Sequence, residues 1–406
     1  MAALPLHRQI DGGFPVGFHQ TKQHRNGKGS FHQIGLVRGQ FGNVPFDQWV
    51  GFLQKSGFDG WEEASWELDL RRCDTDAGAA AYAKERVDLA KRHGLEIFTV
   101  ATHLQGQILG DEPSAKTLNF MGSNTQSRLA YKAWRDSGHQ PPRTNPYFVP
   151  EEVGRLMHQE ATRDLQACVR LAGHLGQLQD RKVVLPGFVG SPANCWSHWF
   201  LFPPLPSGLD GHALPDVREL SLELLVERFA PVWDLCRQYG VTFDLECHPS
   251  ERAMGDLESA GDYINYMCKK GYEGVVGFNL DGSHLEWQNV SVVQFIREFH
   301  HYIHCAHVKG VWVAREHCRA GRLGGHRPMG HWTNGWNFVT AGSARDANSL
   351  EDIFIELNRV GFDGAVSIEW EDNDAEQHAG AQAALARARA ADLPPSGMRH
   401  DDMLKG

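Results

Sequence analysis

The sequence predicts a (β/α)8 barrel, in which eight parallel strands form a closed cylinder inside a ring of helices. Short apolar runs alternate with helix-length segments, a pattern typical of buried parallel strands joined by helices. Such runs begin at Ile34, Gly60, Leu95, Lys182, Val241, Val275, Ile303 and Ala365. Eight alternations favour a closed barrel over an open doubly wound sheet, and no GxGxxG motif follows a strand to indicate a dinucleotide-binding sheet.

The helices expected between these strands end in a recurring glycine turn. Close copies of one four-residue motif occur at 57–60, 271–274 and 361–364, each between a helical segment and an apolar run. A glycine that ends a helix in the left-handed conformation, followed by a second glycine before a strand, suits a short connection. The helices are expected at residues 45–56, 76–93, 150–175, 219–239, 256–270, 291–301, 347–360 and 375–391.

Three stretches are too long to be simple connections, and each follows a strand. They cover residues 104–150, 186–216 and 310–347. Loops after strands lie over the active face of such a barrel, so we expect these insertions to deepen a pocket or to form contacts between subunits. We also expect the protein to be a homo-oligomer. Their aromatic residues suit stacking on sugar rings, and packing within the loops is an equally good interpretation.

One barrel domain accounts for most of the 406 residues. We expect an irregular N-terminal arm over residues 1–32, the barrel over 33–392 and a tail over 393–406. Barrels of this kind routinely exceed 250 residues as a single domain, so the length does not require a second one.

The bulk composition excludes several classes of protein. A hydrophobic content of 41% suits a globular protein, and no run approaches the ~18 apolar residues of a membrane span. The start of the chain lacks an apolar signal core, so we expect a cytoplasmic protein. The net charge of −10 argues against a nucleic-acid partner. Eight scattered cysteines without a CxxC pair indicate free thiols.

Potential metal ligands follow successive predicted strands. Glu246, Asp281 and His307 each stand at the end of an apolar run, and a fourth run, ending in Ser-Ile-Glu369, supplies one more carboxylate. Because the carboxyl ends of parallel strands meet on one side, these side chains should lie together. Two glutamates, an aspartate and a histidine suit one divalent ion, with Mn²⁺ preferred and Mg²⁺, Co²⁺ or Zn²⁺ as further options.

The order of these motifs resembles the sugar phosphate isomerase/epimerase family, the xylose-isomerase-like barrels. The resemblance runs from about residue 34 to about residue 371 and lies in Glu246, Asp281-Xaa-Xaa-His284, His307-Xaa-Lys309 and Ser-Ile-Glu369-Xaa-Glu371-Asp372. It implies that a metal ion is held by Glu246, Asp281, His307 and Glu369, with His284 on the substrate. It also implies a carbohydrate substrate, since members include ketose 3-epimerases, sugar isomerases, inosose dehydratases and lyases of 3-keto-glycosides.

The expected reaction is proton transfer beside the carbonyl of a keto-sugar or related polyol. A divalent ion stabilises the enolate, and Glu246 and Glu369 could flank the substrate, one removing a proton and the other returning it. His284 would polarise a substrate oxygen or protonate a leaving group. If a β-substituent departs, the same enolate gives elimination, so a lyase or dehydratase acting on a 3-keto-glycoside or inosose is the alternative.

Four further residues are candidates for contact with the substrate, each with a structural role as an equal alternative. They are His103, His248, Lys309 and Glu63. Two other functions stay open. A DNA-repair endonuclease on the same barrel should show more zinc ligands and a basic face, and a non-enzymatic subunit should lack a ligand, whereas all four are present.

Overall fold

The computed structural model describes residues 31–199, 202–253, 255–315, 318–323 and 327–396. Most of the predicted N-terminal arm and C-terminal tail lies outside these residues, so the predicted division at 1–32, 33–392 and 393–406 stays a prediction. Within the described residues, no helix is long and apolar enough to cross a membrane. All eight cysteines are free thiols, as the sequence predicts.

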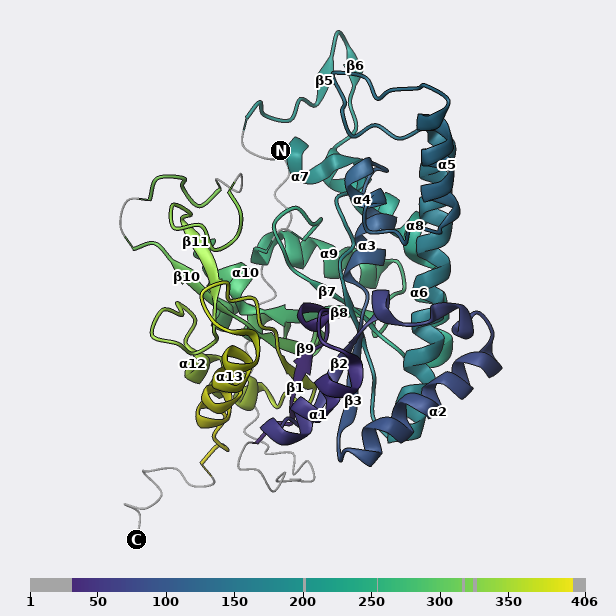
Figure 1. Cartoon of the computed structure of the whole chain (residues 1–406). Helices are drawn as coiled ribbons and strands as arrows, with labels where there is room; N and C mark the ends of the chain where they lie inside the picture. Colours follow the sequence, from purple (N-terminus) through teal and green to yellow (C-terminus); the bar gives the residue numbers. More distant parts are fainter. Residues whose placement is uncertain (1–30, 200–201, 254, 316–317, 324–326, 397–406) are drawn as a thin grey trace.

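Eight parallel strands form the predicted barrel (Figure 1). Their order in the sheet is β3-β2-β1-β12-β9-β8-β7-β4. The barrel strands therefore follow one another around the sheet in chain order, with the first strand, β1, beside the last, β12. The strands are β1 (Ile34–Val37), β2 (Gly60–Ala64), β3 (Glu96–Ala101), β4 (Leu185–Gly187), β7 (Phe243–Glu246), β8 (Val276–Asp281), β9 (Ile303–Val308) and β12 (Ala365–Ile368).

The barrel nearly closes between β3 and β4. Thr99 and Val184 form an isolated parallel bridge, and the Val100 N–H donates to the Val184 carbonyl at 3.0 Å. Further along, the Thr102 N–H donates to the Pro186 carbonyl at 2.7 Å. These bonds leave no open edge there for another strand to pair with, so the closed barrel is confirmed and the open sheet is wrong.

Helices cover the outside of the strands at the predicted places. They are α1 (Phe46–Ser56), α2 (Asp76–Arg92), α6 (Glu151–Gln179), α8 (Val217–Tyr239), α9 (Leu257–Lys269), α11 (Val292–Phe299), α12 (Leu350–Val360) and α13 (Gln377–Ala391). Gly57 and Gly361 end α1 and α12 with φ of 86° and 73°, in the left-handed conformation that the repeated turn predicts. Ser349 begins α12 by accepting a hydrogen bond from the Asp352 N–H.

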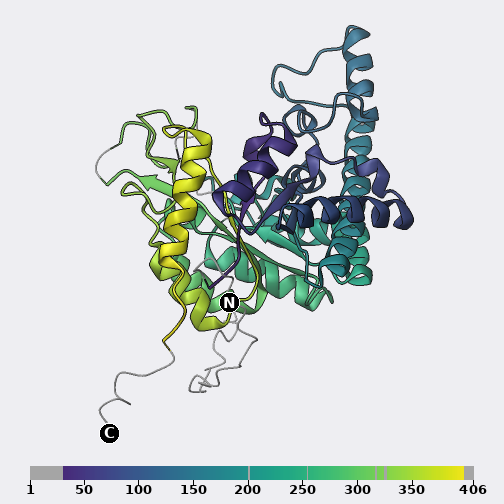
Figure 2. The same ribbon diagram turned by 60° about the horizontal axis from the view of Figure 1, so that its bottom comes forward.

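The two ends of the barrel segment are tied together. α13 lies beside the N-terminal strand and helix (Figure 2), where Gln382 Nε2 donates to Ser56 Oγ at 2.9 Å. The buried Asp392, which follows α13, accepts from the His32 N–H at 2.6 Å and contacts His32 Nδ1 at 2.9 Å. These bonds hold the residue that precedes β1 against the residue that follows the last helix, which keeps the first and last strands adjacent.

The three insertions contain short elements of their own. The first holds α3 (His103–Gly110), α4 (Ala115–Leu118) and α5 (Gln126–Asp136). The second holds α7 (Cys195–Trp199) and the small hairpin β5 (Gly208–Leu209) and β6 (His212–Ala213), which projects at the top of Figure 1. Short α10 (Gly282–Glu286) follows β8, and the third insertion forms the antiparallel hairpin β10 (Gly310–Val313) and β11 (Trp336–Val339).

The barrel interior changes character along its axis. Phe98, Val184, Cys305 and Ala365 form a small apolar cluster separate from the large core between strands and helices. Cys305 precedes His307 by two residues on β9, and Ala365 precedes Glu369 by four, so this cluster lies below the polar residues at the carboxyl ends. An apolar floor of this kind excludes water from beneath the polar site.

Candidate metal centre

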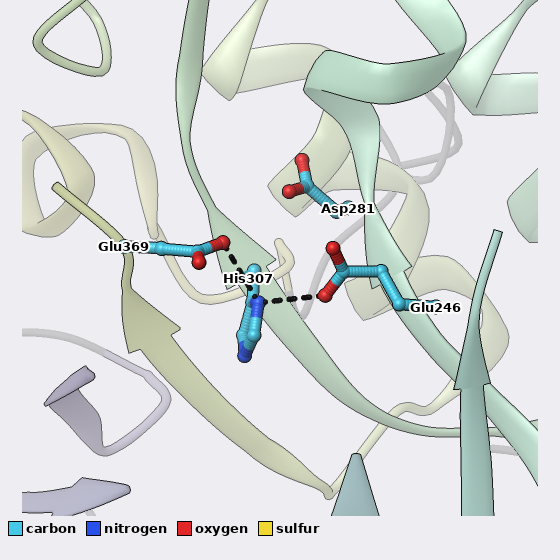
Figure 3. Close-up of side chains that lie close together, drawn as sticks. All are labelled: Glu246, Asp281, His307 and Glu369. Carbon is cyan, nitrogen blue, oxygen red and sulfur yellow. Dashed lines mark hydrogen bonds and ion pairs between the residues drawn. The ribbon is translucent and has the colours of Figure 1, made fainter. Parts of the chain in front are cut away.

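The carboxyl ends of four strands bring the four predicted ligands together. Glu246 ends β7, Asp281 ends β8, His307 lies near the end of β9 and Glu369 follows β12. One nitrogen or oxygen of each lies within 4.8 Å of the others (Figure 3). The parallel register places Asp281 directly opposite His307, which explains why residues 26 positions apart become neighbours.

His307 occupies the middle of this cluster. Its Nδ1 lies 3.1 Å from Glu246 Oε2 and 3.0 Å from Glu369 Oε2, the two contacts drawn in Figure 3. Burial alone would lower the pKa of His307, but the negative charges of Glu62 and Glu369 and the hydrogen bonds of Glu246 and Glu369 raise this pKa well above its usual value. The raised pKa of the ring therefore reflects the negative charge of the carboxylates around it.

One lysine offsets part of that charge. Lys309 Nζ lies 2.9 Å from Asp281 Oδ2 and 2.9 Å from Glu369 Oε2. Burial opposes its ionisation, yet Asp281, Glu369 and other acids raise the pKa of Lys309 well above its usual value. In the described part of the chain, Lys309 is the one lysine or arginine that pairs with any of the three ligand carboxylates, and it pairs with Asp281 and Glu369.

This donor set fits a divalent cation. With His307 counted as neutral, as a metal-bound histidine is, three carboxylates and one ammonium leave a formal charge of −2 in a buried place, which a divalent ion would neutralise. Three oxygen donors and one imidazole nitrogen suit a hard or borderline ion rather than a thiol-binding one. Asp281 is also oriented for the role, because its Oδ1 accepts from the Ser283 N–H at 2.8 Å at the start of α10 while Oδ2 faces the cluster.

Glu246 has the most hydrogen-bond and ion-pair partners of the three ligand carboxylates. Its Oε2 accepts from Asn279 Nδ2 at 2.7 Å and lies 3.2 Å from His103 Nε2, while Oε1 lies 3.2 Å from His284 Nε2. Burial would raise the pKa of Glu246, but hydrogen bonds from the three histidines lower it well below its usual value. In return, Glu246 raises the pKa of His103 against the opposing effect of burial. Glu246 is therefore ionised, and His103 is placed to carry a proton.

The rings of His284 and His248 meet edge to face beside the ligands, with their planes 69° apart. Their ring centroids are 4.4 Å apart, and His284 Nε2 also lies 3.3 Å from Asp281 Oδ2. Burial and the positive charges of His284 and Lys309 lower the pKa of His248 to about 3. His248 is therefore neutral and contributes a ring face to the wall of the site.

Comparison with known proteins gives the family of this chain. Residues 50–391 match the family described as xylose isomerase-like TIM barrel. The chain belongs to that family. A curated relative, the uncharacterized protein YfiH from Bacillus subtilis, is 32% identical over 99 residues, which are 24% of this chain and 32% of the relative. The chain thus matches about a third of that relative's length.

Solved structures show the same fold. A 3-keto-D-glucoside 4-epimerase from E. coli superposes with a TM-score of 0.51 at 14% identity, covering 88% of this chain and 99% of that one. A D-psicose 3-epimerase from Clostridium cellulolyticum gives 0.50 at 14% identity over 88% and 99%. The probable 3-DHS dehydratase AsbF from Bacillus anthracis gives 0.52 at 14% identity over 87% and 97%.

In this family member, Glu63 does not join the cluster. The structure turns Glu63 to the outside of β2, where both its oxygens accept from Arg86 at 2.8 Å. Its neighbour Glu62 points inward, since successive strand residues face opposite sides. Glu62 Oε2 lies 3.2 Å from His307 Nε2. The predicted pocket position of Glu63 is therefore corrected to Glu62.

Two more polar residues at the site are absent from the sequence prediction. Asn279 pairs with Glu246 in the sheet register, and its position two residues before Asp281 is the signal that places it on the same face. Gln40, in the short turn after β1, donates from Nε2 to Glu369 Oε1 at 2.8 Å and to Glu371 Oε1 at 3.1 Å. Its loop position carried no periodic signal.

Access to the cluster lies on the side of Glu371. The Glu371 side chain is 31% exposed, compared with 3% or less for Glu246, Asp281 and His307. Burial raises the pKa of Glu371, with Lys309 opposing this rise. Two surface cavities of about 400 and 520 Å³ are lined by residues at the opposite, amino ends of the strands, such as Val241 and Leu95, and have no part in this site.

The third insertion covers the other side. Phe338 on β11 places its ring 4.4 Å from Lys309 Nζ and 5.5 Å from the His284 ring. Trp336 stacks on Trp287 with centroids 4.7 Å apart and planes 7° apart. For Trp336, packing within the protein is thus the better interpretation. The hairpin excludes water from Lys309 and His284, which strengthens their electrostatic interactions.

Proposed function

We propose that this protein is a divalent-metal-dependent isomerase or epimerase that moves a proton beside the carbonyl of a keto-sugar or related polyol. The observation that carries the proposal is the convergence of Glu246, Asp281, His307 and Glu369 within 4.8 Å. Bound there, a divalent ion would supply Lewis-acid polarisation of the carbonyl and lower the pKa of the neighbouring C–H. We favour Mn²⁺ because the set mixes carboxylates with one imidazole, and Mg²⁺, Co²⁺ and Zn²⁺ are the alternatives.

The two glutamates are assigned the proton transfers. Glu246 and Glu369 come from strands separated by β8 and β9, and both approach His307 from different sides. The pKa of each is below its usual value, because hydrogen bonds and nearby positive charges outweigh burial. Both are therefore ionised, so either can accept the proton and the other, once protonated by solvent, can return one to the opposite face.

Other polar groups are assigned to the substrate. His284 and Lys309 would donate hydrogen bonds to a substrate oxygen, and they already lie 3.2 Å apart beside the ligands. His103, with a side chain 12% exposed, and Glu371 line the accessible side and would bind hydroxyl groups. His248 would restrict the volume beside His284 rather than bind the ion.

Similar proteins support a carbohydrate substrate. The epimerases of similar fold act on a 3-keto-D-glucoside and on D-psicose, both keto-sugars. For this chain a keto-sugar is a proposal, because 14% identity supports the fold alone. We also propose a cytoplasmic, homo-oligomeric enzyme; eight free thiols suit a reducing compartment.

A lyase or dehydratase is the second candidate, and His103 is the observation that favours it. Its pKa is raised by Glu246, so it would hold a proton that a departing hydroxyl or alkoxide could take. A probable dehydratase has a similar fold. In that reaction Glu246 or Glu369 would remove the proton beside the carbonyl, and His103 would protonate the β-substituent as its C–O bond breaks.

Incubation of the Mn²⁺-loaded chain in D₂O tests both candidates. The substrates are free ketohexoses and 3-keto-glucosides, followed by NMR and mass spectrometry, with Glu369→Gln as the inactive comparison. Deuterium incorporation beside the carbonyl with a new epimer or isomer supports the first proposal, and release of a β-substituent supports the second. Absence of exchange with every substrate from a chain shown to hold Mn²⁺ contradicts both.

A further inference from the structure

Behind the proposed metal ligands, across the barrel interior, lies a buried carboxylate that no step above uses. Glu62 is on β2, and two strands, β1 and β12, lie between β2 and β9 in the sheet. Its side chain is 1% exposed, and its Oε2 lies 3.2 Å from Nε2 of His307, whose side chain is also 1% exposed. The contact therefore reaches the ring nitrogen that faces away from Glu246 and Glu369.

We propose that Glu62 is a positioning residue that fixes the orientation and tautomer of the His307 imidazole, so that Nδ1 presents its lone pair to the bound metal ion. The inference rests on the proposed metal site and assigns the residue that prepares one of its ligands. The Glu62 oxygen that faces His307 already accepts a hydrogen bond from Thr99, and a carboxylate oxygen acts as an acceptor, so the hydrogen between Glu62 and His307 belongs to Nε2. Nδ1 lies 3.0 to 3.1 Å from the Glu369 and Glu246 oxygens and 3.2 Å from Asn279 Nδ2, and it then carries the lone pair that a metal ion would take.

A hydroxyl holds Glu62 in place. Thr99 Oγ1 donates to the same Oε2 at 2.5 Å, and Glu62 lies opposite Thr99 in the register of β2 and β3. That pairing depends on a one-residue slip after Trp61, which passes over Phe98. Glu62 Oε1 makes no hydrogen bond, so the contacts of this carboxylate converge on the oxygen that faces His307.

The adjacent residue shows what an ordinary structural carboxylate looks like on this strand. Glu63 is equally buried, but both of its oxygens pair with the Arg86 guanidinium. In the described part of the chain, Glu62 has no lysine or arginine partner, and its ion-pair partner is His307. Burying a carboxylate without a permanent cation is costly, so its place against His307 needs a reason, and preparation of a metal ligand supplies one.

The test compares Glu62→Gln with Glu63→Gln in the full-length chain. After removal of metal with a chelator, Mn²⁺ affinity is measured by isothermal titration calorimetry, and thermal unfolding is followed by circular dichroism. We expect Glu62→Gln to weaken Mn²⁺ binding by about 10- to 100-fold, the range for groups that orient a metal-bound histidine. Glu63→Gln should lower stability by breaking the Arg86 pair and leave Mn²⁺ affinity at the wild-type value.

A spectroscopic measurement separates positioning from a purely structural role. Co²⁺ replaces Mn²⁺, and its visible absorption reports ligand geometry; the spectrum should change in Glu62→Gln and stay the same in Glu63→Gln. Unchanged affinity and spectrum in Glu62→Gln overturn the inference alone. A wild-type chain that binds neither ion contradicts the proposed function and the inference with it.

Thr99→Val provides a second variant if Glu62→Gln does not fold. It removes the hydroxyl that holds Glu62 while keeping the size of the side chain. A smaller loss of Mn²⁺ affinity in the same direction supports the inference, and wild-type affinity and Co²⁺ spectrum in this variant overturn it.

Discussion

An acid from β7 and a histidine from β9 contact each other at two heights of the barrel interior. At the carboxyl end, Glu246 and His307 belong to the cluster of three carboxylates and one lysine. Two or three residues lower, Asp244 Oδ1 and His304 Nδ1 form a single contact of 2.8 Å. The residue types match closely, yet the surroundings differ: the lower acid has one histidine partner, whereas the upper histidine contacts several acids.

The difference lies in the balance of charge. The lower aspartate, Asp244, contacts His304 and accepts a hydrogen bond from the Thr242 hydroxyl at 3.4 Å. Both of its oxygens therefore have partners within the protein. His304 reaches it through a local slip in the register of β8 and β9, because Phe278 pairs with Ile303 and Asn279 with Cys305. The upper cluster keeps an excess of two negative charges in a buried place. A matched pair is explained by stability alone, but an unmatched cluster calls for a cation.

Replacing the upper acid should have the largest effect. Glu246→Gln removes a ligand and a proposed base, so we expect kcat with the keto-sugar found in the D₂O screen to fall by about 10²- to 10⁴-fold. Metal bound per chain, measured by elemental analysis, should fall with it. Full activity with one metal ion still bound would show that Glu246 has neither role.

A half-buried acid outside the cluster, Asp346, should give a smaller effect that depends on pH. Asp346 accepts from the Gly342, Val311 and Asn348 N–H groups, and burial raises its pKa from 3.8 to about 6. The folded state holds the proton of Asp346 more tightly than the unfolded chain does, so protonation of Asp346 stabilises the fold. This stabilisation is at most about 3 kcal/mol; it is complete below pH ~4 and is lost by about pH 6.

Urea unfolding of wild type and Asp346→Asn between pH 4 and 7 measures this contribution. The stability of wild type relative to the variant should decrease as the pH rises from about 4 to 6 and then stay level. If the difference in stability between wild type and the variant did not change with pH, the pKa of Asp346 would be the same in the folded and unfolded states. The charge argument for a cation at the metal cluster would then be weaker as well.

Replacing the lower acid should have the smallest effect. Asp244→Asn keeps a hydrogen-bond acceptor for His304 but removes the charge, so we expect a loss of about 1 kcal/mol in the free energy of unfolding. Mn²⁺ affinity and activity should match wild type. If this variant loses metal as Glu246→Gln does, the two heights of the barrel are coupled and the comparison fails.

Most of the fold could be predicted from the sequence because alternation and turn chemistry are local signals. The glycine turns at Gly57 and Gly361 and the eight apolar runs each reflect neighbouring residues. The four clustered residues were predictable for a related reason: parallel strands fix which ends meet, so residues that end strands must converge.

The remaining details depend on contacts that no local pattern encodes. β2 is buried on both faces, so Trp61, Glu62 and Glu63 show no alternation that says which glutamate points inward. The register slip that pairs Glu62 with Thr99 is likewise invisible in the sequence. Gln40 reaches Glu369 only because the ends of the barrel meet, 329 positions apart.

The metal site itself can be tested by a crystal structure of the chain grown with Mn²⁺, with anomalous scattering recorded at the manganese edge. We expect one strong anomalous peak bonded to Glu246, Asp281, His307 and Glu369, with His307 Nδ1 as the nitrogen ligand. A map with no peak among these four side chains, while Lys309 and His307 still pair with the carboxylates, would contradict the proposed metal site.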